Sequence, residues 1–391
     1  MNAAIDPRRL VAGGDMPAGE RRVVRVAIVT NIPAPYRLPI YELLAGMPGI
    51  ELQVFFCSGR EPDRDWDLQR LRVVHVFLRE RMLTWAGRFI HTNPDVWPRL
   101  REFAPDVVVT TGFNPTHLIA FAYAHAHAHR VRHVAMTDGT ENSEASLSGL
   151  HRWLRRIVYA RSQAFIGASE GSFALYRRFG VADGALFKSH LCADNPAFAA
   201  AMRPERDIDM LFCGRFVASK SPLFAIEVAA AVGRRLARRV VLLVLGSGEL
   251  EGRMRQAGQD VATWVDVRFG GFARQGELPL HYARSRLLLF PSAGEPWGVV
   301  ANEACAAGVP VIVSPHAGAA DDLVRDHENG RVLPLDVARW AEAAAALLDD
   351  GANWERMSRR GLELVAEYTY ANAAAGIAAA VVHAVDAGGG E

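Results

Sequence analysis

The sequence predicts an α/β protein built from two doubly wound domains. Apolar, β-branched runs alternate with helical stretches along the chain, as in a parallel sheet covered on both faces. Two such series follow one another, and 391 residues are too many for one hydrophobic core. Ligands bind beyond the carboxyl ends of the strands in such sheets, so we expect the site in the cleft between the domains.

The first series defines an N-terminal domain over residues 23–195. Residues 1–22 contain arginines and glycines but no apolar segment typical of a secretory signal, so we expect a disordered tail there. Strands are expected at 23–31, 51–56, 106–111, 133–137 and 164–169, and helices at 36–46, 93–103, 115–129, 147–161 and 170–179.

The second series defines a C-terminal domain over residues 205–368. Between the two series, residues 193–207 are rich in proline and charge, and we expect the linker there. Strands are expected at 209–214, 240–246, 264–271, 286–292 and 309–314, and helices at 219–235, 249–257, 275–284, 298–307, 335–349 and 352–386. The end of the chain, 369–391, is a candidate to cross back to the first domain.

Composition narrows the class of protein. The formal net charge is +1, which does not favour a nucleic-acid partner. No apolar run approaches the roughly 18 residues that span a bilayer. The four cysteines are scattered without metal-like spacing, which fits a reducing cytoplasm. These observations predict an ordinary cytoplasmic globular protein.

The most informative segment is residues 290–334, where Glu295 and Glu303 are separated by seven residues. Glu295 lies in a loop that ends at Gly298, and Glu303 lies in the helix that follows. The backbone N–H groups of Trp297, Gly298 and Val299 stand at that helix start, where they can bind an anion or sugar hydroxyls. Glu303 has small, apolar neighbours, so we expect a buried helix and a partner for its carboxylate.

Two further loops follow strands of the second series. Arg215 and Lys220 come after the strand that ends at Gly214, and two cations beside a helix start suit a diphosphate, although solvated surface charges are the alternative. Gly246 and Gly248 form a turn after the next strand. They either let a nucleotide approach the backbone closely or provide a turn that needs positive φ.

Together these motifs resemble the family-4 retaining nucleotide-sugar glycosyltransferases of the GT-B fold, also called glycosyl transferases group 1. The resemblance rests on the two glutamates, on the G-x-P-V-I run from Gly308 and on the G-R-x4-K loop, and it is specific over 208–334. Trp297 stands where the family usually has Phe. The loop 31–37 after the first strand has no glycine, although the family often has a glycine-rich loop there.

The resemblance implies a role for each matching residue. Arg215 and Lys220 would bind the donor diphosphate, Glu295 would hold hydroxyls of the transferred sugar and Glu303 the nucleotide ribose. Asp138 or a neighbour would replace a histidine that some members place near the sugar. Trp297, Gly298, Val299, Gly214, Gly246 and Gly248 would complete the donor site.

The reaction implied is transfer of a sugar from UDP or GDP with retained configuration. The acceptor would be a glycan or a lipid-linked sugar in bacterial cell-surface polysaccharide biosynthesis. It would bind to the N-terminal domain 23–195, and the nucleotide-sugar donor to the C-terminal domain 205–368. The departing phosphate would take the acceptor proton, and the two cations make a metal cofactor unnecessary.

Three alternatives remain open. One is another GT-B enzyme, such as a sugar-nucleotide epimerase or a phosphorylase. A dehydrogenase would need G-x-G-x-x-G after the first strand, which 31–37 lacks. The third is a non-catalytic sugar-nucleotide-binding protein, which would be expected to lose the two glutamates.

Metal sites are not favoured by the sequence. The Asp-x-Asp pairs at 63/65, 65/67 and 207/209 do not follow a strand in a suitable position, and we interpret them as chance. His125 and His129 are four residues apart and can hold zinc, but a solvated helix face is the better interpretation.

Residues 146–162 form a basic, amphipathic segment without acidic residues. Leu150, Leu154, Ile157 and Val158 form its apolar stripe, and arginines surround that stripe. The segment either rests on an anionic membrane surface on the inner face or is a core helix with a polar outer face.

Overall fold

The computed structural model describes residues 23–61, 71–85, 88–141, 148–203 and 205–387. The predicted tail 1–22 and the aspartates of 63–67 lie outside these residues. The chain divides into two compact units, which are called unit 1 and unit 2 below. Unit 1 comprises the chain up to Leu191 together with the segment from Tyr370 onward, and unit 2 comprises Cys192–Thr369.

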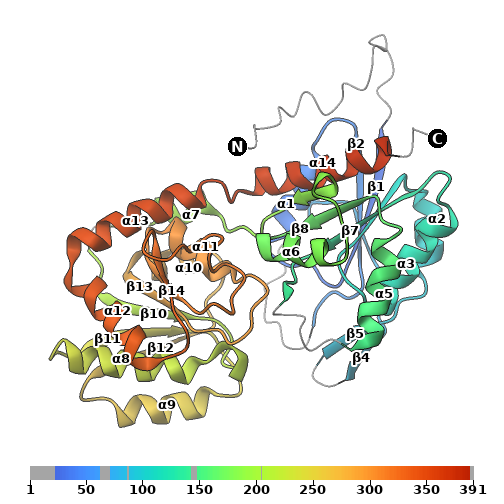
Figure 1. Ribbon diagram of the computed structural model, residues 1–391. Helices are drawn as coiled ribbons and strands as arrows, with labels where there is room; N and C mark the ends of the chain where they lie inside the picture. Colours follow the sequence, from blue (N-terminus) through green and yellow to red (C-terminus); the bar gives the residue numbers. More distant parts are fainter. Residues whose placement is uncertain (1–22, 62–70, 86–87, 142–147, 204, 388–391) are drawn as a thin grey trace. The chain divides into compact units, whose positions relative to one another are not determined.

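Unit 1 is built on a parallel sheet of seven strands in the order β3-β2-β1-β6-β7-β8-β9. Figure 1 labels β1, β2, β7 and β8 of this sheet. β1 lies at the point where the strand order reverses, because β2 is on one side and β6 on the other. The strands are β1 (Val24–Thr30), β2 (Ile50–Phe56), β3 (His75–Phe77), β6 (Val107–Thr110), β7 (Arg132–Thr137), β8 (Ala164–Gly167) and β9 (Leu186–Lys188).

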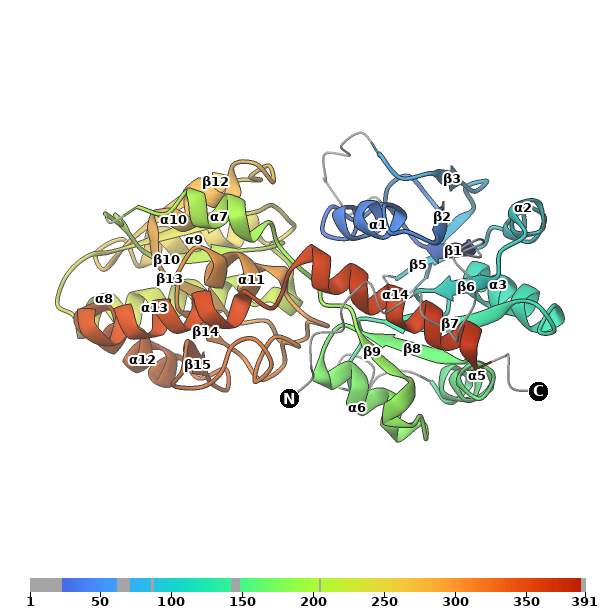
Figure 2. The same ribbon diagram turned by 90° about the horizontal axis from the view of Figure 1, so that it is seen from above.

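Helices cover both faces of this sheet. Ala27 and Val29 of β1 pack against α2 and α3, and the alternation of side chains along a strand turns Val26 and Ile28 to the other face. There α14 packs against α1 and against β7, β8 and β9 (Figure 2). The helices are α1 (Leu38–Ala45), α2 (Val96–Phe103), α3 (Pro115–Ala126), α5 (Gly149–Tyr159), α6 (Glu170–Arg178) and α14 (Tyr370–Asp386).

Short elements of unit 1 were not predicted. β3 and β9 have three residues each, and the antiparallel hairpin of β4 (Met82–Trp85) and β5 (Arg88–His91) forms a sheet of its own. Segments this short carry too few residues for a periodic pattern, so their pairing partners decide whether they become strands.

Unit 2 contains a parallel sheet of six strands in the order β12-β11-β10-β13-β14-β15. Its strand order reverses at β10, between β11 and β13. The strands are β10 (Ile208–Cys213), β11 (Val240–Leu245), β12 (Val265–Gly271), β13 (Ser285–Phe290), β14 (Val311–Val313) and β15 (Gly330–Val332). Two parallel, doubly wound sheets confirm the predicted fold class.

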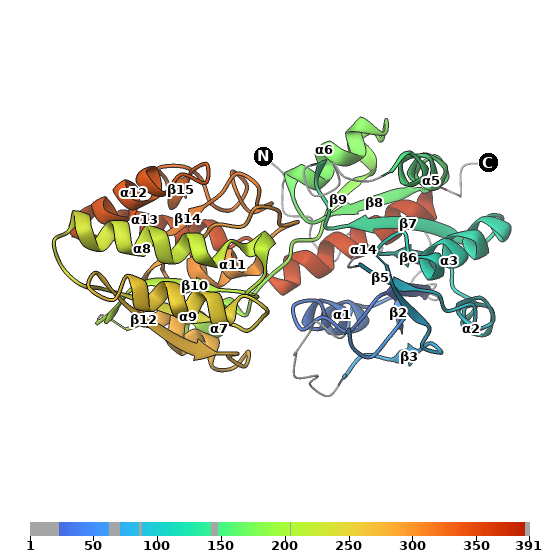
Figure 3. The same ribbon diagram turned by 90° about the horizontal axis from the view of Figure 1, so that it is seen from below.

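The core of unit 2 lies between its sheet and the helices α8, α9 and α12, of which α8 and α9 are seen in front of the sheet in Figure 3. Met210, Leu242 and Leu287 point to this face, together with Met254 of α9 and Trp340 of α12. The helices of the unit are α7 (Asn195–Ala200), α8 (Pro222–Arg235), α9 (Glu251–Asp260), α10 (Leu278–Ala283), α11 (Val299–Ala306), α12 (Val337–Asp349) and α13 (Gly351–Val365).

The predicted linker 193–207 is not a plain connection, because it contains α7. The side chain of Asp194 caps this helix by accepting a hydrogen bond from the backbone N–H of Ala197 at 3.2 Å, and Pro196 fits its first turn. Phe198 is buried against Tyr282 of α10. The helix therefore belongs to unit 2, and six residues were too few to show a helical period in the sequence.

Candidate functional site

The predicted donor residues of unit 2 lie on the loops that leave β10 and β13. These two strands are neighbours at the point where the strand order reverses, which is where open α/β sheets bind ligands. Gly214, Arg215 and Lys220 follow β10, and Glu295 follows β13. The sheet topology therefore places sequence positions about 80 apart on adjacent loops, as the resemblance implies.

The structure brings Lys220 and Glu295 into direct contact. The Lys220 ammonium forms an ion pair with the Glu295 carboxylate, and about a fifth of each side chain is exposed. The two loops are also joined through Ser219, whose carbonyl accepts hydrogen bonds from the backbone N–H of Ala293 at 2.8 Å and from the hydroxyl of Ser292 at 3.1 Å. A cation and a carboxylate are thus held together beyond the carboxyl ends of β10 and β13.

The backbone around Glu295 is held by the segment after β14. The Glu295 N–H donates to the carbonyl of His316 at 3.1 Å, and the Glu295 carbonyl accepts from the N–H of Gly318 at 2.9 Å. A side chain at Gly318 would collide with the carbonyl of Pro296. The loop of Glu295 is therefore positioned by close backbone contact at a site where only glycine fits.

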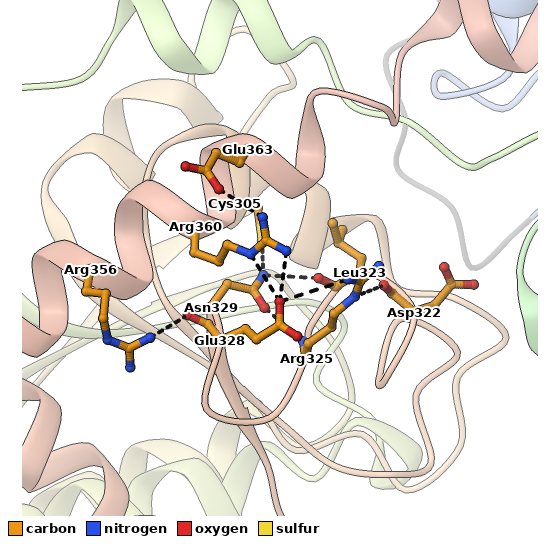
Figure 4. Close-up of polar contacts among 9 residues, drawn as sticks. All are labelled: Cys305, Asp322, Leu323, Arg325, Glu328, Asn329, Arg356, Arg360 and Glu363. Carbon is orange, nitrogen blue, oxygen red and sulfur yellow. Dashed lines mark hydrogen bonds and ion pairs between the residues drawn. The ribbon is translucent and has the colours of Figure 1, made fainter. Parts of the chain in front are cut away.

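A polar network in turn fastens the segment that follows Gly318 to α11 and α13 (Figure 4). The buried Asn329 amide donates to the carbonyl of Leu323 at 3.0 Å and lies 3.5 Å from the sulfur of Cys305 on α11. Arg360 of α13 contacts the Glu328 carboxylate at 3.0 Å. The segment that positions the Glu295 loop is thus anchored to two helices, α11 and α13.

Helix α11 begins at Val299, directly after Gly298, whose φ is 98°. The side chain of Trp297 points into unit 2. It is 1% exposed, its indole N–H donates to the Asn302 side-chain oxygen at 2.7 Å, and its ring stacks on Tyr368 at 5.6 Å between centroids. Trp297 is therefore buried in unit 2, where it anchors the helix start.

Glu303 is buried in α11 and its partner is Tyr282 of α10. The Tyr282 hydroxyl donates to the Glu303 carboxylate at 2.7 Å. Burial raises the pKa of the Glu303 carboxyl to about 7, and the hydrogen bond from Tyr282 counteracts this rise. The expectation of a buried helix and a partner for Glu303 is confirmed, and the partner is a tyrosine that sequence analysis did not identify.

Gly246 and Gly248 have φ angles of 135° and 153°, and both face protein backbone. A side chain at Gly246 would collide with the carbonyl of Gly214, and one at Gly248 would lie 2.7 Å from the carbonyl oxygen of Phe216. The Phe216 N–H also donates to the carbonyl of Ser247 at 2.8 Å. The need for glycine at both positions is thus explained by the packing of two loops.

In unit 1, the predicted residue Asp138 lies just after β7 and is paired with Arg37. Arg37 is 6% exposed and also lies 3.4 Å from the hydroxyl of Ser189. Asp138 and Arg37 line a cavity of about 180 Å³ at the carboxyl ends of β1, β6 and β7. The loop 31–37, which has no glycine, forms much of its wall.

Helix α5 favours the second alternative for residues 146–162, a core helix; residues 146 and 147 lie outside the described residues. Val158 is buried in the core of unit 1, and Ile157 packs against the same cluster. Arg155 is also buried, with its guanidinium over the ring of Phe113. Ile157 and Val158 of the apolar stripe thus face the core of unit 1, whereas Leu150 is exposed.

The outer face of α5 is nevertheless not purely polar. Leu150 and Trp153 are 62% and 57% exposed, and Arg152, Arg156 and Arg161 are exposed beside them. Among the described residues, no helix combines the length and the apolar character that a bilayer span requires. In the same part of the chain, no group of three or more His, Cys, Asp or Glu side chains is arranged to hold a metal ion.

Tyr282, His316 and Gly318 contribute to the site but were not singled out by the sequence analysis. Each acts on a residue distant in the sequence: Tyr282 on Glu303, and the other two on the Glu295 backbone. The expectation that buried Glu303 needs a donor was the one signal that could have led to Tyr282, through a search of neighbouring helices for a hydroxyl.

Comparison with known proteins identifies the class of the second half of the chain. Residues 195–363 match the family described as Glycosyl transferases group 1. This range contains Arg215, Lys220, Glu295 and Glu303. The prediction of a glycosyl transferase domain is therefore confirmed for this part of the chain.

Two curated relatives and one solved structure extend the comparison. The chain is 28% identical over 180 residues to glycogen synthase of Mycobacterium tuberculosis, with 46% of this chain and 43% of the relative covered. It is 30% identical over 190 residues to D-inositol 3-phosphate glycosyltransferase 1 of Catenulispora acidiphila, with 46% and 45% covered. The chain thus spans less than half the length of these relatives.

The solved structure is HepE of Anabaena in complex with UDP and glucose. It matches with a TM-score of 0.71 at 14% identity and covers 91% of this chain and 98% of that one. This likeness shows the fold, which is GT-B, with two Rossmann-like units.

Proposed function

We propose that the protein is a retaining glycosyltransferase of family 4 that transfers a sugar from UDP or GDP to a hydroxyl of an acceptor. The observation that carries the proposal is the contact between Lys220 and Glu295 beside the start of α11. It lies inside the range 195–363 that matches Glycosyl transferases group 1. Structural relatives that hold UDP and glucose support a nucleotide-sugar donor.

In the proposed mechanism the donor exchanges partners with the ion pair. Lys220 and Arg215 turn to the diphosphate, Glu295 accepts hydrogen bonds from hydroxyls of the transferred sugar, and Glu303 accepts them from the ribose. The bond between the anomeric carbon and the β-phosphate oxygen breaks, and negative charge develops on that phosphate. Two cations and the backbone N–H groups at the start of α11 stabilise this charge, which lowers the barrier.

The acceptor oxygen then bonds to the anomeric carbon on the same face of the ring. Its proton passes to the departing phosphate oxygen, so the reaction needs no separate base. Asp138 in unit 1 forms an ion pair with Arg37, and we assign it to acceptor binding.

A donor screen tests this proposal. Purified protein is incubated with UDP- and GDP-sugars, and release of free nucleotide is followed with and without glycan or lipid-linked acceptors. The proposal predicts release of one nucleoside diphosphate and a product whose anomeric configuration, read by NMR, matches that of the donor. An epimerase would release no nucleotide, a phosphorylase would require inorganic phosphate, and a binding protein would show no turnover.

We further propose that α5 brings the enzyme to an anionic membrane surface carrying a lipid-linked acceptor. Leu150 and Trp153 are exposed apolar side chains, and Arg152 and Arg156 lie on the same outer face. Aromatic and basic residues together favour the interface of anionic bilayers. Such a role would fit cell-surface polysaccharide biosynthesis on the inner face of the membrane.

Liposome co-sedimentation tests the role of α5. Vesicles containing phosphatidylglycerol should retain the protein at low salt and release it at high salt, because exposed charges are screened. The double variant Trp153→Ala/Arg156→Glu should not be retained by the vesicles. Arg101→Glu, at an exposed position of α2, is the matched control and should be retained like the wild type. Equal retention on neutral phosphatidylcholine vesicles would refute the electrostatic part.

A further inference from the structure

The Glu303 carboxylate belongs to a chain of three polar side chains within unit 2. Glu303 lies on α11, Tyr282 lies on α10, and Cys213 is the last residue of β10. The Tyr282 hydroxyl donates to Glu303 Oε2 at 2.7 Å and also forms a hydrogen bond with the Cys213 thiol. Three elements that are distant in the sequence thus meet at one hydroxyl group.

The hydrogen bonds of this chain have one direction when Glu303 is ionised. A tyrosine hydroxyl has a single proton and a carboxylate can only accept, so the Tyr282 proton is directed to Glu303. The Tyr282 oxygen is then the acceptor toward Cys213, and the thiol donates. The chain therefore runs from Cys213 through Tyr282 to Glu303.

Tyr282 is held in place by the core of unit 2. Its side chain is fully buried, and the ring of Phe198 on α7 packs edge-on against it with 5.5 Å between the ring centroids. Its backbone carbonyl accepts a hydrogen bond from the Arg206 guanidinium at 3.2 Å. A donor that is fixed in this way orients the Glu303 carboxylate before a ligand arrives, which lowers the entropic cost of binding.

Cys213 places this chain at the edge of the sheet where ligands bind. It stands at the carboxyl end of β10, and Gly214 and Arg215 begin the loop that follows. Burial and, to a smaller extent, the charge of Glu303 raise the pKa of the Cys213 thiol to about 12. The thiol therefore keeps its proton at neutral pH and remains a donor to Tyr282.

One oxygen of the Glu303 carboxylate is left for a ligand. Tyr282 occupies Oε2, and no described residue donates a hydrogen bond to Oε1. Among the described residues, Tyr282 and Cys213 are the titratable side chains that interact with the Glu303 carboxyl. Only 6% of Glu303 is exposed, and a buried oxygen without a donor is costly, so a ligand hydroxyl at Oε1 would remove that cost.

We propose that Tyr282, supported by Cys213, is a positioning residue of the donor site, which orients the Glu303 carboxylate so that Oε1 accepts hydrogen bonds from the ribose hydroxyls of the nucleotide. The inference rests on the proposed glycosyltransferase function, in which Glu303 binds the ribose. It adds the side chains through which the protein prefers a ribose to a ring without these hydroxyls.

Calorimetry on the full chain with matched nucleotides measures the recognition of the ribose. UDP and GDP are each compared with their 2′,3′-dideoxy forms at pH 8, where most of Glu303 is ionised. The wild type should bind one natural nucleotide about tenfold more tightly than its dideoxy form, and Tyr282→Phe should reduce this ratio to about threefold or less. An unchanged ratio in folded Tyr282→Phe protein overturns the proposal.

Three further variants show whether the effect belongs to this chain of side chains. Tyr123→Phe is the matched control and should keep the wild-type ratio, because Tyr123 is a buried tyrosine of unit 1 whose hydroxyl donates to the Leu100 carbonyl at 3.3 Å. Cys213→Ala should reduce the ratio about twofold, and Cys213→Ser should restore it, since a hydroxyl can replace the thiol as donor. A wild-type ratio in Cys213→Ala overturns the role of Cys213.

A measurement without ligand separates this inference from the proposed function. NMR of ¹³C-labelled glutamate side chains gives the ionisation midpoint of Glu303, whose signal is assigned with Glu303→Gln. Tyr282→Phe should raise this midpoint, because the hydrogen bond from Tyr282 lowers the pKa of the Glu303 carboxyl.

The outcomes of the two measurements are distinct. Equal midpoints in the wild type and in Tyr282→Phe contradict the positioning role alone, whether or not a nucleotide binds. A raised midpoint in the variant, with no binding of UDP or GDP to the wild type, contradicts the proposed donor site and with it the role in ribose binding.

Discussion

Both units place a cation and a carboxylate beyond the carboxyl ends of their central strands, but the two pairs differ in their surroundings. In unit 1, the Arg37 side chain is 7% exposed and is also held by Ser189. In unit 2, Lys220 and Glu295 are 19% and 17% exposed, and they lie beside a helix start. The comparison teaches that the same sheet topology can fix a cation for structure or present it for exchange with a ligand.

The loop after the first strand is also built differently in the two units. In unit 2 this loop begins at Gly214 and packs closely on Gly246 of the neighbouring loop. In unit 1 it is the glycine-free loop 31–37, whose side chains line a cavity. The first loop is thus shaped by close backbone packing, whereas the side chains of the second shape the wall of a cavity.

The largest expected effect is on the pair of unit 2. Lys220→Ala and Glu295→Ala should each lower turnover about a hundredfold or more, because each removes charge at the reacting centre. The measurement is the rate of nucleotide release with the donor found in the screen. Glu251→Ala, on exposed α9, serves as the control.

The double variant sharpens this prediction. Since Lys220 and Glu295 contact each other, their effects on turnover should not add, and the double variant should lose less than the product of the single losses. Wild-type turnover in both single variants would contradict the proposed roles of Lys220 and Glu295. The pair of unit 2 would then have a structural role only, like the pair of unit 1.

A second effect tests the glycine contact of unit 2. Gly246→Ala should lower the free energy of unfolding by about 2 kcal/mol, because the methyl group meets the Gly214 carbonyl and φ is 135°. Chemical denaturation measures the change. Gly252→Ala is the matched control in α9, where nothing crowds the position, and it should stabilise by about 0.5–1 kcal/mol.

A third effect tests whether the pair of unit 1 is structural. Arg37→Ala should destabilise the protein by about 1.5 kcal/mol, since it leaves Asp138 without its partner; the value is less than for a fully buried pair because a third of Asp138 is exposed. Lys220→Ala should destabilise the protein less than Arg37→Ala, because 19% of the Lys220 side chain and 7% of the Arg37 side chain are exposed. Equal losses in denaturation experiments would erase the distinction between the two pairs.

The smallest effect concerns Glu303, whose folded-state pKa is raised to about 7. Its contribution to stability is fully present below the unfolded pKa and is lost as pH rises through about 7, because ionisation in a buried site is costly. Glu303→Gln should therefore be the more stable protein at pH 8 but bind UDP about fivefold more weakly.

Calorimetry at pH 6 and pH 8 measures the affinity for UDP. Wild-type affinity for UDP should rise between these values as the Glu303 carboxyl ionises, and the variant should lack that rise. If Glu303→Gln bound UDP as tightly as the wild type at both pH values, a contact between Glu303 and the ribose would be excluded.

The long elements of the fold were predictable because each carries a repeated pattern. β1, β10 and β11 are mostly apolar, and the structure places each within one or two residues of its predicted range. The short strands β9 and β15 and the helix α7 were not predicted. A strand of three residues is too short to show a clear alternation, and a helix of six residues has fewer than two turns.

The candidate site was predictable where a residue type and its spacing carry the chemistry. Lys220 and Glu295 were expected at one ligand, and their loops do meet. The orientation of side chains was not predictable: Ile157 and Val158 of α5 face the core, and the indole of Trp297 faces Asn302. Which face of a helix or loop is covered depends on neighbours that are distant in the sequence.

The alternation of strands and helices along the chain, the glycines at the turns and the charged residues of the donor loops are local properties. The amino-acid sequence by itself therefore predicted two doubly wound units and the candidate donor residues of the second. Tertiary structure alone decided which charges meet. Arg37 finds Asp138, Glu61 finds His91 and Glu303 finds Tyr282 because buried polar groups must pair, and packing determines which partners are within reach.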